Sequence, residues 1–357
     1  MATPLERARD SVLVRWRASG LAIQSAVANL QHAKADERFL VVHHHTNPFP
    51  YDLLFAWLEV FFPEVRARFE LRPLGAAVRD WSRYRLHVPW LQDPVQAWSA
   101  RAYRRALRLN DECRARGIPV VNPVDQLANA GKAAGAAHIA SVGFRTPRVV
   151  PVGDWARFRR DRAGLAFPFL LREDWGHGAI TVRVDNEADL AAVRVESFRR
   201  PVASEFVDVV SPDGLFRKYR YVVAGDLGVR QSVHVASRWE VRGTPDRAVY
   251  SEAIRDEEIA FTSSPEPEHE RFQAARRALG VDFAAFDYSH DQEGRLVVWE
   301  ANPLPSIRLS GGRRRYRTVP TCRVLIAMVR LYYERAGLEP PPNLDDALTG
   351  FSERPAG

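Results

Sequence analysis

The segment from Val281 to Pro305, VDFAAFDYSHDQEGRLVVWEANPLP, constrains the fold of this chain most, because it predicts two strands joined by a tight turn. Apolar and aromatic residues dominate Phe283–Tyr288, and Arg295–Trp299 contains the apolar run Leu-Val-Val. The residues between these two stretches are polar and end in a glycine, a combination typical of hairpin turns. We therefore expect a β-hairpin in this segment.

Three oxygen-bearing side chains stand at the ends of the predicted strands. Asp287 lies near the end of the first strand, Glu300 ends the second, and Asn302 follows two residues later. Pairing the strands brings Asp287 close to Glu300, and the spacing of Glu300 and Asn302 puts both on one face. Such oxygens suit Mg²⁺ on a nucleotide phosphate. A hairpin with solvated acids is the alternative, but the rigid Asn-Pro-Leu-Pro exit favours fixed ligands.

The formal net charge of +7 raises the question of nucleic-acid binding. Lysine occurs only at Lys34, Lys132 and Lys218, and the arginines are spread through every segment among acids, which argues against a basic binding face. One dense cluster, Arg313–Arg315 with Arg317, fits either a solvated loop or a polyanion site. We expect no nucleic-acid partner.

Two further features of the sequence indicate in which cellular compartment the protein is expected. No apolar run reaches the roughly 18 residues of a membrane-spanning helix, and the first residues lack the apolar core of a signal peptide. Cys113 and Cys322 lie far apart without metal or redox spacing, although a disulfide between them stays open. We expect a cytoplasmic protein that binds no membrane, and we leave a homodimer open.

Strand and helix patterns alternate over residues 1–122, with strands predicted at Ser11–Trp16 and Phe39–His45 and one long helix over Val95–Arg116. This alternation predicts an α/β domain with a parallel sheet. The domain lacks the G-x-G-x-x-G fingerprint of dinucleotide binding. In the triplet His43–His45 at most two side chains share a face of the strand, so we favour a structural role over contact with a substrate.

The pattern changes after residue 122 to short helices and returning strands. Strands predicted at Phe216–Val223, Leu227–Val235 and Ser237–Val241 form an antiparallel meander, and a helix predicted at Pro267–Leu279 leads into the hairpin. This part of the chain is therefore expected to be α+β.

Four segments, in their order along the chain, resemble the ATP-grasp superfamily, in which ATP lies between two α+β lobes. IPVVNPVDQLANAGKAAGAAHIASVGFRTPRVV (118–150) resembles the entry with its lysine-bearing helix, and FPFLLREDWGHGAITVRV (167–184) resembles the strand–glycine loop–strand that covers the phosphates. VASEFVDVV (202–210) resembles the strand leading to the adenine-reading hinge, and FAAFDYSHDQEGRLVVWEANPLPS (283–306) resembles the metal-binding strands.

The resemblance implies a two-lobed ATP-grasp fold preceded by an α/β domain. Its parts would be the N-terminal domain at 1–122, a small lobe at 123–200, a C-terminal lobe at 201–338 and a loosely held tail at 339–357.

The resemblance also implies roles for individual residues. Lys132 matches the first phosphate-binding lysine of the family, whereas Arg172 stands where the family has its second lysine, and a guanidinium can still pair with phosphate. The remaining nucleotide contacts would come from His177 and Gly178 at the phosphates, from Glu205, Phe206 and Val207 at the adenine edge, and from Asp208 at the ribose. The metal ligands would be Asp287, Glu300 and Asn302, holding one or two Mg²⁺ or, alternatively, Mn²⁺.

The substrate side departs from the family pattern. The family carries D-x-R after the hinge, but this chain has Lys218-Tyr219-Arg220, in which the acid is missing. A phosphorylated intermediate needs fixed cations, and several arginines follow in the sequence. We favour Arg230 and Arg308 as catalytic residues because of their positions relative to the hinge and the metal strand.

The function implied by the resemblance is that of an ADP-forming ligase, which joins a carboxylate to an amine through an acylphosphate. The substrates would be a small-molecule carboxylate and amine, with amino acids and peptides included. Two alternatives remain open from the sequence. One is a kinase of the same fold acting on a small-molecule acceptor, and the other is a nucleotide-binding module without turnover.

Overall fold

The computed structural model describes residues 20–44, 52–91, 95–175, 180–241 and 249–348. The chain forms two compact units. Unit 1 consists of Met1–Asp125, Ser306–Leu309 and Thr321–Gly357, and unit 2 consists of Gln126–Pro305 and Ser310–Pro320. The predicted strand at Ser11–Trp16 lies outside the described residues.

Unit 1 contains a three-stranded parallel sheet with the order β2-β1-β3. This arrangement agrees with the α/β pattern of its sequence. The sheet packs through aromatic side chains, because Phe39 meets Phe69 edge to face at 5.3 Å between ring centroids and Tyr333 at 5.5 Å. Its strands are β1 (Arg38–His43), β2 (Phe69–Pro73) and β3 (Tyr84–Trp90), and its helices are α2 (Asp52–Phe61), α3 (Pro63–Arg66), α4 (Val95–Trp98), α5 (Ala100–Ala115) and most of α11 (Thr318–Ala336).

The long helix expected over Val95–Arg116 is wrong, since the chain breaks it at Ser99 into α4 and α5. Ser99 has extended backbone dihedrals, and its hydroxyl accepts a hydrogen bond from the amide of Ala102 at 3.1 Å. A serine in this conformation caps a new helix, because its oxygen satisfies an amide that has no partner in the first turn.

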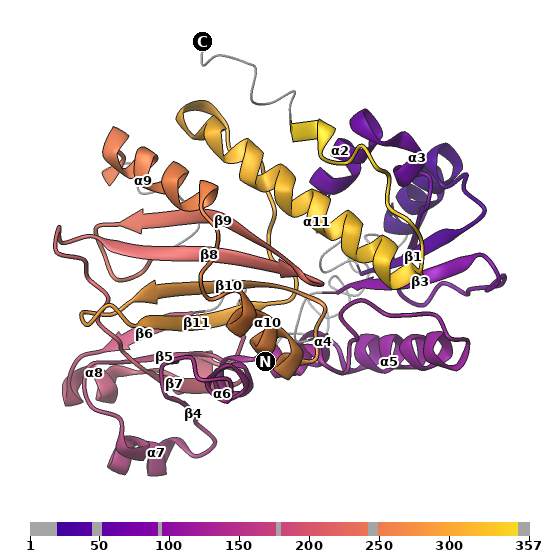
Figure 1. Ribbon diagram of the computed structural model, residues 1–357. Coiled ribbons are helices and arrows are strands. Elements are labelled where there is room, and N and C mark those ends of the chain that lie inside the picture. Colours follow the sequence, from indigo (N-terminus) through magenta and orange to yellow (C-terminus); the bar gives the residue numbers. More distant parts are fainter. Residues whose placement is uncertain (1–19, 45–51, 92–94, 176–179, 242–248, 349–357) are drawn as a thin grey trace. The chain divides into compact units, whose positions relative to one another are not determined.

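Unit 2 contains two four-stranded antiparallel sheets, which we call the β5 sheet and the β10 sheet (Figure 1). The β5 sheet has the order β4-β7-β5-β6, and the β10 sheet has the order β11-β10-β8-β9. The β5 sheet consists of β4 (Val149–Pro151), β5 (Phe169–Glu173), β6 (Thr181–Val184) and β7 (Pro201–Glu205), with α6 (Lys132–Ala140), α7 (Trp155–Asp161) and α8 (Glu187–Ala192) beside it. The β10 sheet consists of β8 (Phe216–Ala224), β9 (Leu227–Ala236), β10 (Phe283–His290) and β11 (Leu296–Asn302), with α9 (Glu252–Ser263) and α10 (His269–Leu279) beside it.

The strand expected at Ser237–Val241 is wrong, because β9 already ends at Ala236 and the following described residues form bends. Trp239 instead packs its ring edge to face against Phe206 at 6.0 Å between centroids. This tertiary contact is not visible in a local sequence pattern.

The expected hairpin is confirmed as β10 and β11, and its turn is held by one carboxylate. Asp291 Oδ1 accepts hydrogen bonds from the amides of Glu293 at 3.0 Å and Arg295 at 2.8 Å. Gly294 takes a positive φ of 75°, which glycine adopts without a steric penalty. The polar segment between the strands therefore closes the turn as its composition predicted.

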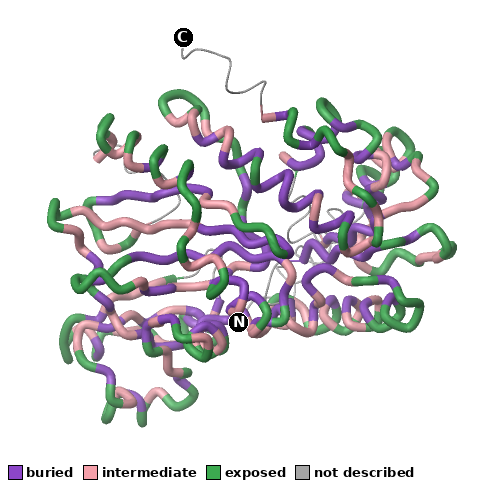
Figure 2. The backbone as a smooth tube through the Cα atoms, in the orientation of Figure 1, coloured by how far each residue is buried: buried purple, intermediate pink, exposed green. Residues whose placement is uncertain are grey.

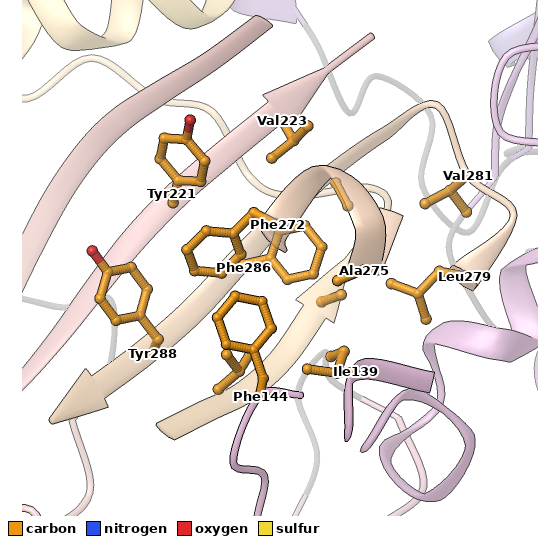
Figure 3. Close-up of a cluster of buried hydrophobic side chains, with 13 residues drawn as sticks. Ile139, Phe144, Tyr221, Val223, Phe272, Ala275, Leu279, Val281, Phe286 and Tyr288 are labelled. Atoms are coloured by element: carbon orange, nitrogen blue, oxygen red, sulfur yellow. The ribbon is translucent and has the colours of Figure 1, made fainter. Parts of the chain in front are cut away.

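One face of the β10 sheet carries a hydrophobic core cluster of unit 2. Phe286 and Tyr288 alternate with Asp287 along β10, so the two aromatic rings share the face that Phe272 of α10 covers. Figure 3 shows the rings of Phe272, Phe286 and Phe144 grouped together. The centroids of Phe286 and Phe144 lie 5.1 Å and 4.7 Å from that of Phe272. The buried stretch of β10 is visible in Figure 2. Asp287 consequently projects from the opposite face.

Replacing Phe272 by alanine should lower the free energy of unfolding by about 3–5 kcal/mol, because the change removes a fully buried ring and leaves a cavity. Urea-induced unfolding measures this loss. The matched control is Ile259→Ala in the same unit, whose side chain is 38% exposed and should cost less than about 1 kcal/mol. Equal, small losses in the two variants would contradict this assignment of the core.

Candidate functional site

The pairing of β10 with β11 brings three predicted ligands to one face of the β10 sheet. Asp287 is opposite Glu300 in the register, and Asn302 is opposite Ala285. The register shifts after Asp287, where Tyr288 pairs with Val298. Trp299 of β11 is therefore a bulge residue with no opposite residue on β10. The predicted proximity of Asp287 and Glu300 is therefore confirmed.

Asp287 is buried and holds two cations. Arg220 Nε donates to Oδ1 at 2.7 Å and Arg220 Nη2 donates to Oδ2 at 2.9 Å, while Lys218 Nζ lies 3.0 Å from Oδ2. Burial on its own opposes ionisation of Asp287, but the charges of Arg220 and Lys218 outweigh it and hold the pKa of this carboxyl far below its usual range. Asp287 is therefore a carboxylate with both oxygens engaged.

Glu300 forms an ion pair with Lys132, which begins helix α6. The N-terminus of α6 is fixed by Asp174, which follows β5: its backbone oxygen accepts from the amide of Lys132 at 3.3 Å and its Oδ1 accepts from Ala133 at 3.0 Å. Arg200 Nη2 holds the other carboxylate oxygen of Asp174 at 2.9 Å. The start of α6 is thus anchored to the end of β5, and Lys132 reaches the β10 sheet from there.

Arg172 is half-buried, and its guanidinium has no carboxylate partner among the residues that the structure describes. It lies in β5, opposite Thr181 and Val202 in the neighbouring strands. Its Nε is buried and has no hydrogen-bond acceptor among the residues that the structure describes. Burial lowers the pKa of Arg172. A buried N–H donor of this kind favours a ligand that can accept from it, such as an anion, because an unsatisfied buried donor is costly.

The expected hinge residues connect the β5 sheet to the β10 sheet. Glu205 ends β7, and its Oε2 accepts from the amide of Arg148 at 3.0 Å. The guanidinium of Arg183 lies 4.3 Å from the ring centroid of Phe206. The side chain of the next residue along the chain, Val207, is buried in a cluster with Val209, Val297 and two partly buried aromatic residues, and Asp208 Oδ1 accepts from the amide of Val210 at 3.0 Å.

Two predicted nucleotide ligands, His177 and Gly178, lie outside the described residues. The strands on either side of them do pair. β5 and β6 form an antiparallel ladder in which Arg172 is opposite Thr181. The strand–loop–strand arrangement expected for this segment is therefore present in its described part.

Arg230 lies on the face of the β10 sheet opposite to Asp287. Its Nε donates to Glu266 at 2.9 Å, and its guanidinium lies 4.6 Å from the ring centroid of Phe261 on α9. The cause is a register shift between β8 and β9, after which Arg230 pairs with Tyr221 on the core face. Arg308, the second predicted catalytic residue, belongs to unit 1.

Arg220 is the arginine that the structure brings to Asp287, and a buried histidine lies close to it in the sheet. His234 is opposite Lys218 in the register, and its Nε2 lies 3.3 Å from the hydroxyl of Ser232. Its Nδ1 has no partner among the described residues. Burial, followed by the charges of Lys218 and the neighbouring arginines, holds the pKa of His234 below its usual range. The only signal for this cluster in the sequence was the altered D-x-R pattern.

The structure separates the predicted metal ligands into two kinds. Glu300 and Asn302 present oxygens from one face of β11. Lys132 pairs with Oε2 of Glu300, and Asn302 Oδ1 accepts from the amide of Leu304 at 2.9 Å. No second cation pairs with Glu300 among the described residues, so the two side chains still suit an Mg²⁺ ion that also keeps water and phosphate ligands. Asp287 does not fit this role, because both of its oxygens already contact Arg220 and Lys218. Within the described ranges, no three His, Cys, Asp or Glu side chains form a metal-binding group.

The structure also shows the surroundings of two features that the sequence left open, the histidine triplet and the arginine cluster. His43 is fully buried, and its Nε2 lies 2.9 Å from the hydroxyl of Ser25, a contact that fits a structural role. In the arginine cluster, Arg317 is buried and pairs with Glu258, whereas the guanidinium of Arg313 lies 6.0 Å from the ring centroid of Tyr250. At least part of this cluster is therefore built into the fold.

Cys113 and Cys322 are both buried and free, so the disulfide that the sequence left open is not formed. Among the described helices, none combines the length and apolar character that a membrane crossing requires.

Comparisons with known proteins give matches in structure but not in sequence. No protein-family model matches the chain, and no curated protein matches its sequence. Solved structures do match. The ATP-grasp ligase PsnB, complexed with a minimal precursor, is 16% identical and aligns with 82% of this chain and 100% of its own, with a TM-score of 0.51.

Two other solved structures have similar scores. The VanG D-Ala:D-Ser ligase from Enterococcus faecalis is 14% identical, with 84% of this chain and 100% of its own aligned and a TM-score of 0.52. The macrocyclase MdnC from Microcystis aeruginosa MRC, bound with precursor peptide MdnA, is 11% identical. It aligns with 81% of this chain and 98% of its own, with a TM-score of 0.52. These likenesses support the resemblance seen in the four sequence segments. The chain adopts the fold of the ATP-grasp ligases.

Proposed function

We propose that this protein is an ADP-forming ligase that joins a carboxylate to an amine through an acylphosphate. The observation that carries the proposal is the ion pair between Lys132 and Glu300. It joins the lysine-bearing helix of the first sequence segment to the E-x-N strand of the fourth, and these segments are far apart in the chain. The two residues lie together where a nucleotide phosphate and its metal ion would need a cation and a carboxylate.

The nucleotide would lie between the β5 sheet and the β10 sheet. Lys132 and Arg172, whose buried Nε has no acceptor among the described residues, would bind phosphate oxygens. The loop residues His177 and Gly178 would cover the phosphates. The segment between the sheets would bind the nucleoside through the backbone of Glu205, Phe206 and Val207 and through the carboxylate of Asp208.

Mg²⁺, or Mn²⁺ in its place, would be held by Glu300 and Asn302. The ion would supply neutralisation of the charge on the phosphates. Arg220 replaces Arg230 in the proposal as the cation for the reacting groups, because Arg220 shares the face of Glu300 whereas Arg230 does not. Arg308 is kept as a second cation for the phosphorylated intermediate.

The proposed reaction has two steps. A carboxylate oxygen attacks the γ-phosphorus of ATP, the bond from that phosphorus to the β–γ bridging oxygen breaks, and ADP leaves. The amine then attacks the acyl carbon of the acylphosphate, inorganic phosphate leaves, and the amine loses a proton. Fixed cations in the site stabilise the charge that develops in both steps. The two buried, free cysteines fit a reducing compartment such as the cytoplasm.

The substrates are proposed to be amino acids or peptides. Two of the similar structures hold a precursor or precursor peptide, and the third is a D-Ala:D-Ser ligase. A mixture of peptides with free carboxylates and amines is therefore the first substrate pool to test. A kinase would leave the phosphate on the acceptor instead of releasing it, and a binding module would release no ADP.

Glu300→Gln should lower the rate of carboxylate-dependent ADP release by about 100-fold or more, because the site loses a metal-binding carboxylate and the partner of Lys132. The measurement is ADP release with ATP, Mg²⁺ and the substrate pool, with hydroxylamine added to trap an acylphosphate as a hydroxamate. Glu293→Gln, at an exposed carboxylate in the hairpin turn, is the matched control. Full turnover by Glu300→Gln would contradict the site assignment.

Arg172→Met should weaken binding of an ATP analogue by about 10-fold, equal to about 1.4 kcal/mol, without lowering the stability of the ligand-free protein. Among the described residues the guanidinium has no carboxylate to leave unpaired, and methionine removes a buried N–H donor that has no acceptor there. Calorimetry measures the affinity, and thermal unfolding measures the stability. A loss of stability with unchanged affinity would show that Arg172 supports the fold and not the ligand.

A further inference from the structure

Asp287 is surrounded by fixed cations of the chain itself. Both of its oxygens accept from Arg220, and Lys218 Nζ lies 3.0 Å from Oδ2. The Asp287 side chain is 2% exposed, and those of Lys218 and Arg220 are 18% and 17% exposed. This is a built arrangement in the interior of the sheet, not a pair of mobile surface side chains.

The strand register produces this arrangement. Asp287 of β10 is directly opposite Arg220 of β8, and Lys218 lies two residues earlier in β8 on the same face. On its other side, Lys218 is opposite His234 of β9, whose pKa is held well below its usual range by burial and then by the neighbouring cations. His234 therefore adds no charge to the cluster, and Lys218 has Asp287 as its carboxylate partner.

The balance of charge limits how many further cations this face can accept. The two carboxylates Asp287 and Glu300 face the three cationic side chains Lys132, Lys218 and Arg220. A nucleotide triphosphate would add negative charge and would favour Lys132 and one metal ion at Glu300. A second divalent ion at Asp287 would have to approach an ammonium and a guanidinium at hydrogen-bond distance from the same carboxylate, where like charges repel.

We propose that Lys218, with Arg220, takes the place of a divalent cation at Asp287. The nucleotide complex then contains one divalent ion, on Glu300 and Asn302, and Asp287 is not a metal ligand. The inference rests on the proposed function, because it concerns the metal content of the nucleotide complex. It gives the missing acid of the D-x-R pattern a physical meaning, since Lys218 in that position supplies positive charge in place of a carboxylate.

The test counts Mn²⁺ ions bound in the presence of saturating β,γ-imido ATP, by electron paramagnetic resonance of free Mn²⁺. The native protein should bind one ion per nucleotide. Lys218→Asp removes the ammonium and adds a carboxylate, so it should raise the count to two. Glu300→Gln should weaken Mn²⁺ binding at least 10-fold, whereas Asp287→Asn should change it less than 2-fold.

Asp287→Asn leaves two half-buried cations without their carboxylate, so the single variant can fail to fold. The double variant Asp287→Asn with Lys218→Met removes one cation together with the carboxylate, and it should keep one ion per nucleotide with native affinity. Thermal unfolding of each variant confirms that the counted protein is folded.

The outcomes separate this inference from the proposed function. Two ions per nucleotide in the native protein, or loss of Mn²⁺ binding in the double variant, overturns the inference and leaves nucleotide binding intact. Calorimetry with β,γ-imido ATP is run on the same samples. If the analogue does not bind to the native protein, the proposed function and the inference fail together.

Discussion

The alternation of side chains along β10 is the constraint on which the rest of unit 2 depends. Phe286 and Tyr288 must face α10 to close the core, and this fixes Asp287 on the opposite face. A shift of one residue in this strand would bury Asp287 among aromatic rings and expose the core. The hydrophobic packing of β10 therefore positions the carboxylate of Asp287 on the polar face.

The polar face has its own organisation, in which each carboxylate meets a cation from another element. Asp287 holds Arg220 and Lys218 of β8, and Glu300 holds Lys132 of α6. Buried ion pairs add little net stability, because desolvation offsets their attraction. Their value here is positional: they hold the cations at fixed places on the sheet where an anionic nucleotide would need them. Arg172 is the exception, since its guanidinium has no carboxylate partner in the described part of the chain.

Local patterns predicted part of this structure. The hairpin and its turn follow from alternating residues around Asp287 and from a glycine at 294, and both are short-range signals. Strand β3 was not predicted, because Pro89 interrupts its pattern. It forms because β3 is the last strand in the order β2-β1-β3, with an isolated bridge from His87 to Val120 on its outer side, and proline is tolerated at such a position. The break at Ser99 was missed because a capping serine inside a helical pattern resembles an ordinary polar position.

The candidate site was predictable only where the residues share a segment. Glu300 and Asn302 follow from the spacing in one strand, but the choice between Arg220 and Arg230 depended on a register shift in β9. In a regular ladder Arg230 would face Asp287, and the extra residue turns it toward Glu266 instead. The partners of Asp287 come from β8, so no local pattern contains them.

The most direct test of the proposed nucleotide site is a crystal structure with β,γ-imido ATP and Mg²⁺. We predict phosphate oxygens within hydrogen-bond distance of Lys132 and Arg172, whereas a nucleotide bound away from both residues would contradict the account.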